Sequence, residues 1–161
     1  FLKHYQSFGF ETGSREQEGY AAELEATQQS VKRMRDVGVK VLVGGDYGLN
    51  ITPHGTYATE LQYFTDYFGF SAGQALQAAT KHGGEAFMPE GHLGTLEAGK
   101  IADMVVLNDN PLEDITILQD PDNIVAVIKD GEIYTDLLAK QSLHYKNADQ
   151  LSHILRTKPC S

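Results

Sequence analysis

The sequence predicts an α/β fold in which a helix-and-strand portion precedes a portion rich in β-strands. First, apolar residues recur at helical spacing between residues 14 and 37. Second, a β-branched run at residues 39–43 follows directly, and a helix followed at once by a strand is half of an α/β repeat. Third, two more β-branched runs, residues 102–107 and 124–134, come late in the chain. We therefore place a boundary near residue 90 in a chain whose 161 residues amount to about one domain.

The first long helix is expected to begin after Ser14 and to end near Val37. Ser14 and Gln17 match a capping box, in which the serine accepts from a free helical N–H and the glutamine reaches back. Gly38 follows as a typical helix stop. The next run, residues 39–43, indicates a buried strand, because only one of its five residues is polar.

Two shorter helices are expected in the middle of the chain. One covers about residues 59–68, directly before a glycine. The other begins at a second capping box, Ser71 with Gln74. The glycine pair at residues 83–84 is expected to interrupt this second helix, because glycine is a weak helix former.

The later part of the chain predicts strands and a closing helix. Residues 102–107 indicate one strand, and residues 124–134 bend at 130–131 like a hairpin. Nine acidic residues and one basic residue lie in the segment 102–136, which indicates a solvated outer face. Residues 137–155 are expected to form the closing helix.

Composition excludes several classes of function. The formal net charge of −9 and the pI of about 5.0 argue against a nucleic-acid-binding or anionic-membrane surface. No apolar run approaches the roughly 18 residues of a membrane-spanning helix. The single cysteine, Cys160, excludes an internal disulfide and a cysteine-rich zinc site. No leader-like segment opens the chain, so we expect a cytoplasmic protein.

Asp46 is the first candidate for chemistry. It lies just past the end of the predicted strand at residues 39–43, and the carboxyl ends of parallel strands are where α/β folds build their sites. A carboxylate there can bind a metal or accept a proton from water. The alternative is a structural role, in which the aspartate caps the following turn.

His54 is the second candidate, in the Pro-His-Gly sequence of the same loop. A loop histidine can bind a substrate carboxylate or carbonyl, or move a proton. The alternative is an exposed side chain without a role. His82 and His92 flank glycine-rich turns and are expected to be solvated rather than functional.

The residues alone do not complete a catalytic site. Catalytic zinc needs about three protein ligands, and the sequence contains no His-x-His pair. The glycine-rich segment at residues 44–48 lacks the Gly-Lys-Ser/Thr of a phosphate loop, and no nucleophile elbow occurs.

A family resemblance extends this interpretation. Five stretches occur in a characteristic order: residues 44–48 (GGDYG), 53–55 (PHG), 74–80 (QALQAAT), 93–115 (LGTLEAGKIADMVVLNDNPLEDI) and 127–131 (VIKDG). They resemble the C-terminal signature of the amidohydrolase superfamily, in its imidazolonepropionase-like and prolidase-like subset. The resemblance covers about residues 20–135.

The resemblance implies a fold larger than this chain. Its members are metal-dependent (β/α)₈ TIM barrels with a small β-sandwich domain. Residues 1–90 would then be the last helix-strand-helix units of the barrel. Residues 91–136 would belong to the sandwich domain, and residues 137–161 would form a C-terminal helix and tail.

The resemblance also implies roles for single residues. Asp46 matches the family's strand-eight aspartate, which is a metal ligand and the general base that deprotonates the attacking water. His54 and Tyr47 would contact substrate. Tyr47 stands where the family usually has a small residue and Gly45 where it usually has threonine, and both departures concern the substrate rather than the chemistry.

The implied activity is metal-dependent hydrolysis of a C–N bond in an amide, cyclic amide or dipeptide. The implied cofactor is a divalent metal, one or two zinc ions, held mostly by residues outside this chain. We therefore expect a C-terminal segment whose partners are the N-terminal part of the same enzyme and a small amide substrate. A homo-oligomer is a further possible assembly.

Two other interpretations remain. The chain could be a truncated, non-catalytic module derived from that family, which would serve in folding or interaction. It could also be an unrelated α/β binding module in which Asp46 only caps a loop.

Overall fold

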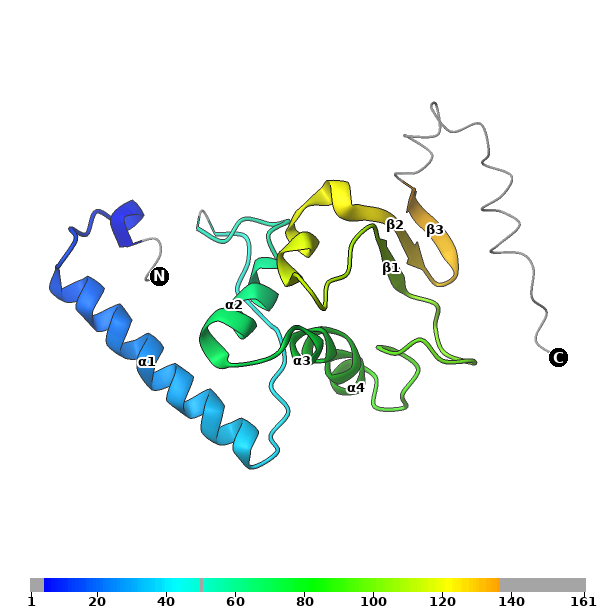
Figure 1. Ribbon diagram of the computed structural model, residues 1–161, viewed down its shortest axis with the longest axis horizontal. Coiled ribbons are helices and arrows are strands. Elements are labelled where there is room, and N and C mark those ends of the chain that lie inside the picture. Colours follow the sequence, from blue (N-terminus) through cyan, green and yellow to red (C-terminus); the bar gives the residue numbers. More distant parts are fainter. Residues whose placement is uncertain (1–4, 50, 137–161) are drawn as a thin grey trace.

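The computed structural model describes residues 5–49 and 51–136, which form an α/β arrangement with one small sheet (Figure 1). In chain order the elements are η1 (Tyr5–Phe8), α1 (Arg15–Asp36), α2 (Thr59–Phe68), α3 (Ala72–Gln77), η2 (Ala78–His82), α4 (Gly83–Phe87), β1 (Met104–Leu107), η3 (Ile115–Gln119), η4 (Pro121–Asn123), β2 (Ile124–Lys129) and β3 (Glu132–Asp136). The predicted helix at residues 137–155 lies outside the described residues.

Helix α1 confirms the first predicted helix and its cap. The Ser14 side chain accepts from the Gln17 backbone N–H, and the Gln17 side chain in turn accepts from the N–H of Gly13, one residue before the cap. Val31 is the one buried residue of this helix, which runs along one side of the molecule apart from the sheet (Figure 1). Among the described helices, none is both long and apolar enough to cross a membrane.

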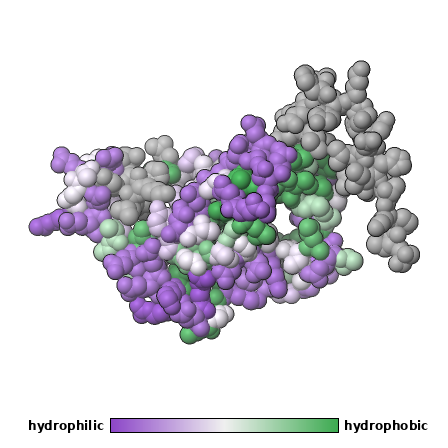
Figure 2. Space-filling model, viewed as in Figure 1, coloured by the Kyte–Doolittle hydropathy of each residue, from purple (hydrophilic) through white to green (hydrophobic). Residues whose placement is uncertain are grey.

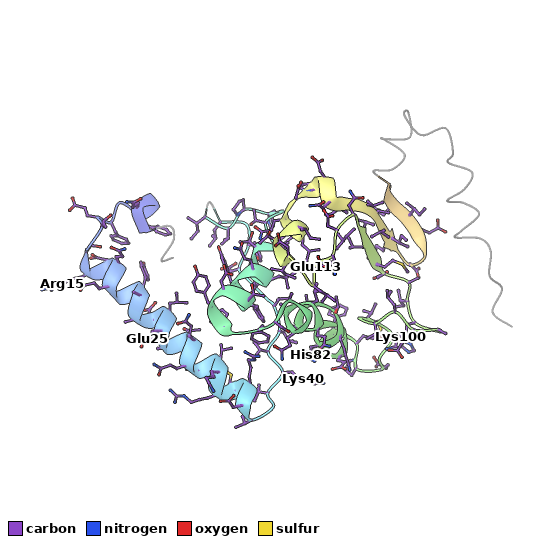
Figure 3. The ribbon with its side chains drawn as sticks, in the orientation of Figure 1. Arg15, Glu25, Lys40, His82, Lys100 and Glu113 are labelled. Carbon is purple, nitrogen blue, oxygen red and sulfur yellow. The ribbon has the colours of Figure 1, made fainter. Side chains whose placement is uncertain are left out.

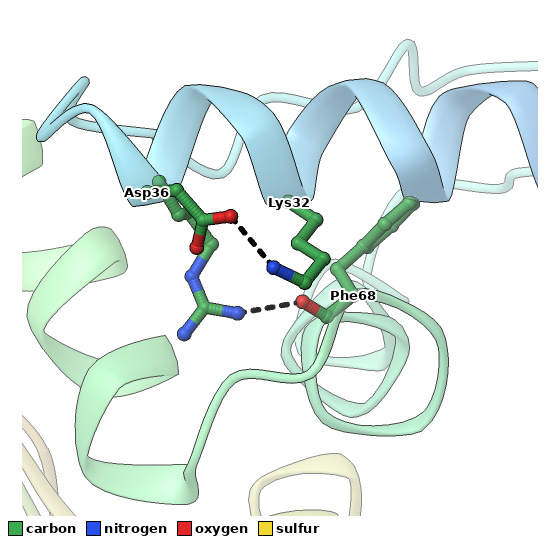
Figure 4. Close-up of polar contacts among 4 residues, drawn as sticks. Lys32, Asp36 and Phe68 are labelled. Carbon is green, nitrogen blue, oxygen red and sulfur yellow. Dashed lines mark hydrogen bonds and ion pairs between the residues drawn. The ribbon is translucent and has the colours of Figure 1, made fainter.

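Arg35 anchors the end of α1 on the next two helices. Its guanidinium donates to the Phe68 carbonyl at 2.7 Å and to Gln74 Oε1 at 3.1 Å, and it lies 3.9 Å from the ring centroid of Phe70. Figure 4 shows the bond to Phe68 beside the exposed Lys32–Asp36 ion pair. One guanidinium therefore ties α1 to the C-terminal end of α2 and to α3.

Replacing Arg35 by methionine is expected to lower the free energy of unfolding of the full-length protein by about 2 kcal/mol, because a charged hydrogen bond and a cation–π contact are lost together. Lysine should restore less than half, because it lacks the planar fork. Arg33→Met, on the exposed side of the same turn, should stay within about 0.5 kcal/mol in urea denaturation. Equal losses for Arg33 and Arg35 would contradict the anchoring role.

The prediction of a buried strand at residues 39–43 is wrong. No described segment forms a ladder with it, while Val39 and Leu42 are 49% and 38% exposed. A strand exists only where a neighbour supplies hydrogen-bond partners, and the three described strands pair with one another instead. The segment still lies on the helices, because Val41 and Val43 pack against the core.

Helix α2 has the predicted bounds and ends at Gly69, whose φ of 68° is left-handed. The predicted capping box before α3 is confirmed in both directions, between Ser71 and Gln74. The expected interruption at Gly83 and Gly84 is wrong, because helical structure continues through η2 and α4 to Phe87.

Gly84 allows close packing of the chain and does not interrupt the helix. A Cβ on Gly84 would lie 2.6 Å from the carbonyl oxygen of Leu93. The loop that leads toward β1 therefore passes directly over the helix, and only a residue without a side chain leaves room for it.

Strands β1, β2 and β3 form one antiparallel sheet in sequence order, which confirms the predicted strands and hairpin. Asp130 and Gly131 connect β2 to β3 with φ values of 51° and 79°. Positive φ at both central residues is the signature of the type I′ turn that suits the twist of a hairpin.

The core joins the helices to the segment between β1 and β2. Its buried members are Leu61, Phe64, Ala75, Ala78 and Ile115. Ile115 comes from η3, so this later segment closes the core over α2 and α3.

The acidic segment lies outside, as expected. All eight of its acidic residues whose exposure is described are exposed. Several hold turns: Asp114 accepts from the Thr116 N–H and hydroxyl, which lowers the pKa of its carboxyl group, and Asp120 accepts from the Asp122 N–H. These acidic residues are therefore solvated, and some of them also stabilise turns.

Candidate functional site

Asp46 lies in the loop between residues 43 and 59, and its side chain is exposed. The Thr52 hydroxyl donates to the Asp46 carbonyl at 2.7 Å, and the Gly48 N–H donates to the Thr52 carbonyl at 2.8 Å. These bonds fold the chain back after Asp46. The Asp46 carboxylate itself makes no hydrogen bond or ion pair with a residue in the described ranges, so the structure gives no support to the alternative that it caps the loop.

Glu60 holds the chain just before Asp46. It lies in the first turn of α2 and is half-buried. Its Oε1 accepts from the Gly44 N–H and its Oε2 from the Gly45 N–H, both at 3.0 Å. Sequence reasoning missed this residue, since a glutamate in the first turn of a helix is ordinary chemistry.

Tyr47, the residue after Asp46, also reaches Glu60. Its hydroxyl lies 3.3 Å from Glu60 Oε2 and 3.3 Å from the Tyr57 carbonyl oxygen. Its ring meets the Tyr57 ring edge-on, with centroids 4.6 Å apart. Burial, and then the nearby Glu60 carboxylate, raise the pKa of the Tyr47 phenol, so this hydroxyl stays a donor at neutral pH.

His54 joins the same cluster through Tyr57. Its Nδ1 lies 2.9 Å from the Tyr57 hydroxyl, and its side chain is exposed. The structure thus brings Tyr47, His54, Tyr57 and Glu60 into one polar and aromatic cluster beside Asp46. We call these four residues the loop cluster.

The other histidines considered from the sequence lie elsewhere. His82, labelled in Figure 3, belongs to η2 on the helical side of the molecule and is half-buried rather than fully solvated. His92 is exposed, and its carbonyl accepts from the Ile101 N–H in the loop before β1. Neither belongs to the loop cluster.

The described residues supply at most part of a metal site. Within residues 5–49 and 51–136, no three His, Cys, Asp or Glu side chains gather as a ligand group. The Asp46 carboxylate fits the part of a single ligand, because it is exposed and has no partner among the residues described. Carboxylate oxygen is an accepted ligand for zinc and other divalent ions.

Comparison with known proteins identifies the family. The Amidohydrolase family model matches residues 20–134. Ochratoxinase from Aspergillus niger is 32% identical over 114 residues, which are 70% of this chain and 24% of that protein. Imidazolonepropionase from Symbiobacterium thermophilum is 27% identical over 113 residues, or 70% of this chain and 27% of that protein.

Solved structures agree with this result. The crystal structure of A. niger ochratoxinase aligns with a TM-score of 0.70 at 26% identity, over 84% of this chain and 31% of that one. A Xaa-Pro dipeptidase with bound methionine in its active site aligns with a TM-score of 0.58 at 36% identity, over 66% of this chain and 25% of that one. The chain spans about a quarter of the length of the curated relatives it matches. The match of the family model confirms the resemblance drawn from the sequence: this chain belongs to the amidohydrolase family.

Proposed function

We propose that this chain supplies the general base of a metal-dependent hydrolase of amide C–N bonds, and that Asp46 is that base. One observation carries the proposal. The chain belongs to the amidohydrolase family, and residues 39–43 lie on the core through Val41 and Val43. Shortly after this segment comes Asp46, an exposed carboxylate without a partner among the described residues. The unrelated binding module does not fit the family match.

Asp46 would hold a divalent metal, zinc by preference, together with ligands outside the described residues. The metal, when bound, would lower the pKa of a water molecule toward neutrality. Asp46 takes the proton as the water attacks the amide carbonyl. It then delivers that proton to the leaving nitrogen, so that the C–N bond breaks with a neutral amine as product.

His54 and Tyr47 are proposed to contact the substrate. His54 Nδ1 is engaged by the Tyr57 hydroxyl, so the remaining ring nitrogen, Nε2, is the one available for a substrate carboxylate or carbonyl. The Tyr47 hydroxyl is engaged by Glu60 and Tyr57, so Tyr47 offers its ring rather than its hydroxyl. Substrates are proposed to be dipeptides or other small amides, as the names of the Xaa-Pro dipeptidase and ochratoxinase relatives suggest.

The partner is proposed to be the remainder of the same enzyme. Residues 1–90 would be the last units of a TIM barrel and residues 91–136 part of a β-sandwich domain. Residues 39–43 have no described strand beside them, and an extended segment with unpaired backbone N–H and C=O groups is a template for pairing with another strand. Apolar residues gather over the sheet in Figure 2. On the strands themselves, Val105 of β1 and Ile133 and Tyr134 of β3 are 53%, 49% and 80% exposed. Preceding barrel strands and the rest of the sandwich would cover these two places.

The test uses the full-length protein that carries this chain. We expect about one or two zinc-like ions per copy and hydrolysis of at least one member of a panel of Xaa-Pro dipeptides, other dipeptides, N-acyl amino acids and cyclic amides. Treatment with a chelator should reduce the rate at least 100-fold, and added zinc should restore it.

The second candidate is the non-catalytic module, which is favoured by the lack of a three-ligand group within the described residues. It predicts a full-length protein without bound metal and without turnover of any member of the panel. Metal analysis therefore separates the two proposals before any substrate is found.

A further inference from the structure

The chain around Asp46 is held from both sides by one carboxylate. Glu60 uses a different oxygen for each of two consecutive backbone N–H groups, at Gly44 and Gly45, which directly precede Asp46. Hydrogen bonds to an ionised acceptor are about twice as strong as neutral ones. Two such bonds to successive residues fix the direction of the chain as well as its distance from α2.

The other side is held through Tyr47. Its hydroxyl reaches Oε2 of the same carboxylate at 3.3 Å, so Glu60 contacts the residues immediately before and after Asp46. Tyr57 also contacts Tyr47, through its ring and through its carbonyl oxygen, which lies 3.3 Å from the Tyr47 hydroxyl. Asp46 is thus the one residue between positions 44 and 47 that Glu60 does not engage.

Gly45 makes this arrangement sterically feasible. A Cβ at Gly45 would lie 2.6 Å from Cε2 of the Tyr47 ring. Real Cβ atoms do not approach a ring carbon that closely, so a side chain at position 45 would push the ring away from Glu60. The absent side chain at Gly45 and the ring of Tyr47 therefore fit each other.

We propose that Glu60 is a positioning residue for Asp46: by binding the chain at Gly44, Gly45 and Tyr47, it fixes the backbone from which the Asp46 carboxylate points. The proposal rests on the proposed function, since it assigns Glu60 a role in that reaction. In this role Glu60 acts through the residues on either side of Asp46 rather than on substrate or metal. A purely structural Glu60 would tie α2 to the segment at residues 39–43 and affect stability alone.

The kinetic test compares Glu60→Gln with Asp66→Asn in the full-length protein. Asp66 is an exposed carboxylate on the same helix, α2, and accepts from the Gln62 side chain. We expect Glu60→Gln to reduce kcat at least 10-fold with KM within two-fold. The glutamine oxygen can accept from only one of the two N–H groups at Gly44 and Gly45, and its NH2 group would face the other donor. Asp66→Asn should change neither value by more than two-fold.

A double-mutant cycle tests the fit between Gly45 and Tyr47. In the wild-type background, Gly45→Ala should reduce kcat about as much as Glu60→Gln, because the displaced ring disturbs the chain at Asp46. In a Tyr47→Ala background there is no ring to displace, so adding Gly45→Ala should change kcat by less than three-fold. Equal effects of Gly45→Ala in the two backgrounds would contradict the fit.

A third readout does not depend on turnover. Because Asp46 is proposed to be a metal ligand, a displaced carboxylate should bind the metal less tightly. The dissociation constant for zinc, measured by competition with a chelator, should rise at least three-fold in Glu60→Gln and stay unchanged in Asp66→Asn.

The outcomes separate the two proposals. If the wild-type protein turns over substrate while Glu60→Gln matches Asp66→Asn in kcat, raises only KM, or lowers only the melting temperature, the positioning role is wrong and the proposed function stands. If Glu60→Gln binds zinc as tightly as the wild-type protein, Asp46 does not depend on Glu60 for its position and the positioning role is wrong. A wild-type protein that binds no metal and hydrolyses no amide overturns the proposed function, and the positioning role with it.

Discussion

Replacing Asp46 by asparagine in the full-length protein is expected to reduce kcat by about a thousand-fold. Asparagine keeps the size of the side chain but cannot accept a proton from water, and a general base contributes about 10²–10⁴-fold to a rate. Because Asp46 is exposed and has no described partner, the free energy of unfolding should change by less than about 0.5 kcal/mol.

The measurement pairs steady-state kinetics on the best amide of the panel with urea denaturation. Asp109→Asn is the matched control, because Asp109 is an exposed aspartate in the loop after β1, outside the loop cluster. It should leave kcat within two-fold. Full activity in Asp46→Asn would contradict the assignment of Asp46, and a large loss of stability would show that the aspartate has a structural role instead.

Replacing Phe64 by alanine is expected to lower the free energy of unfolding by about 3–5 kcal/mol, the usual cost of removing a buried ring. Phe64 is 5% exposed, and its ring centroid lies 6.0 Å from that of Phe68 and 4.8 Å from that of Phe70. The cavity would open where α2, α3 and η3 meet, so all three would lose contacts.

Equilibrium urea denaturation of the full-length protein, followed by circular dichroism, measures this loss. Asp66→Ala provides the control on the same helix, and it should stay within about 0.5 kcal/mol because Asp66 is exposed. Phe64→Leu should fall between the two, since leucine fills part of the space. A loss below about 1 kcal/mol for Phe64→Ala would mean that the core described around α2 does not carry the stability of this region.

Features that depend on neighbours in sequence could be predicted well. The bounds of α1 and α2 follow from helical periodicity and terminal glycines, and the Ser71–Gln74 capping box forms as expected. The hairpin turn at Asp130 and Gly131 is equally local. In each case the hydrogen-bonding partners lie within a few residues of each other, so the pattern alone contains the information.

The errors concern partners far away in the sequence. Residues 39–43 have the composition of a strand but lack a described neighbour. Gly84 lies within a helix and leaves room for the carbonyl oxygen of Leu93, a contact that the glycine pair alone does not indicate. For the site, Asp46, Tyr47 and His54 were chosen from the sequence, and they remain a proposal for function. Glu60 was missed because nothing near it in sequence marks its bonds to residues 44 and 45.

The amino-acid sequence by itself determined the family, the helix limits, the hairpin and the residues considered for chemistry, because each is encoded in a short run of side chains. Only the tertiary structure decided which groups surround Asp46. The loop returns to α2 through bonds that span 15 and 16 residues, and the ring of Tyr47 needs the space that Gly45 leaves empty. Such contacts depend on how distant segments meet in space, and a linear pattern carries no record of that geometry.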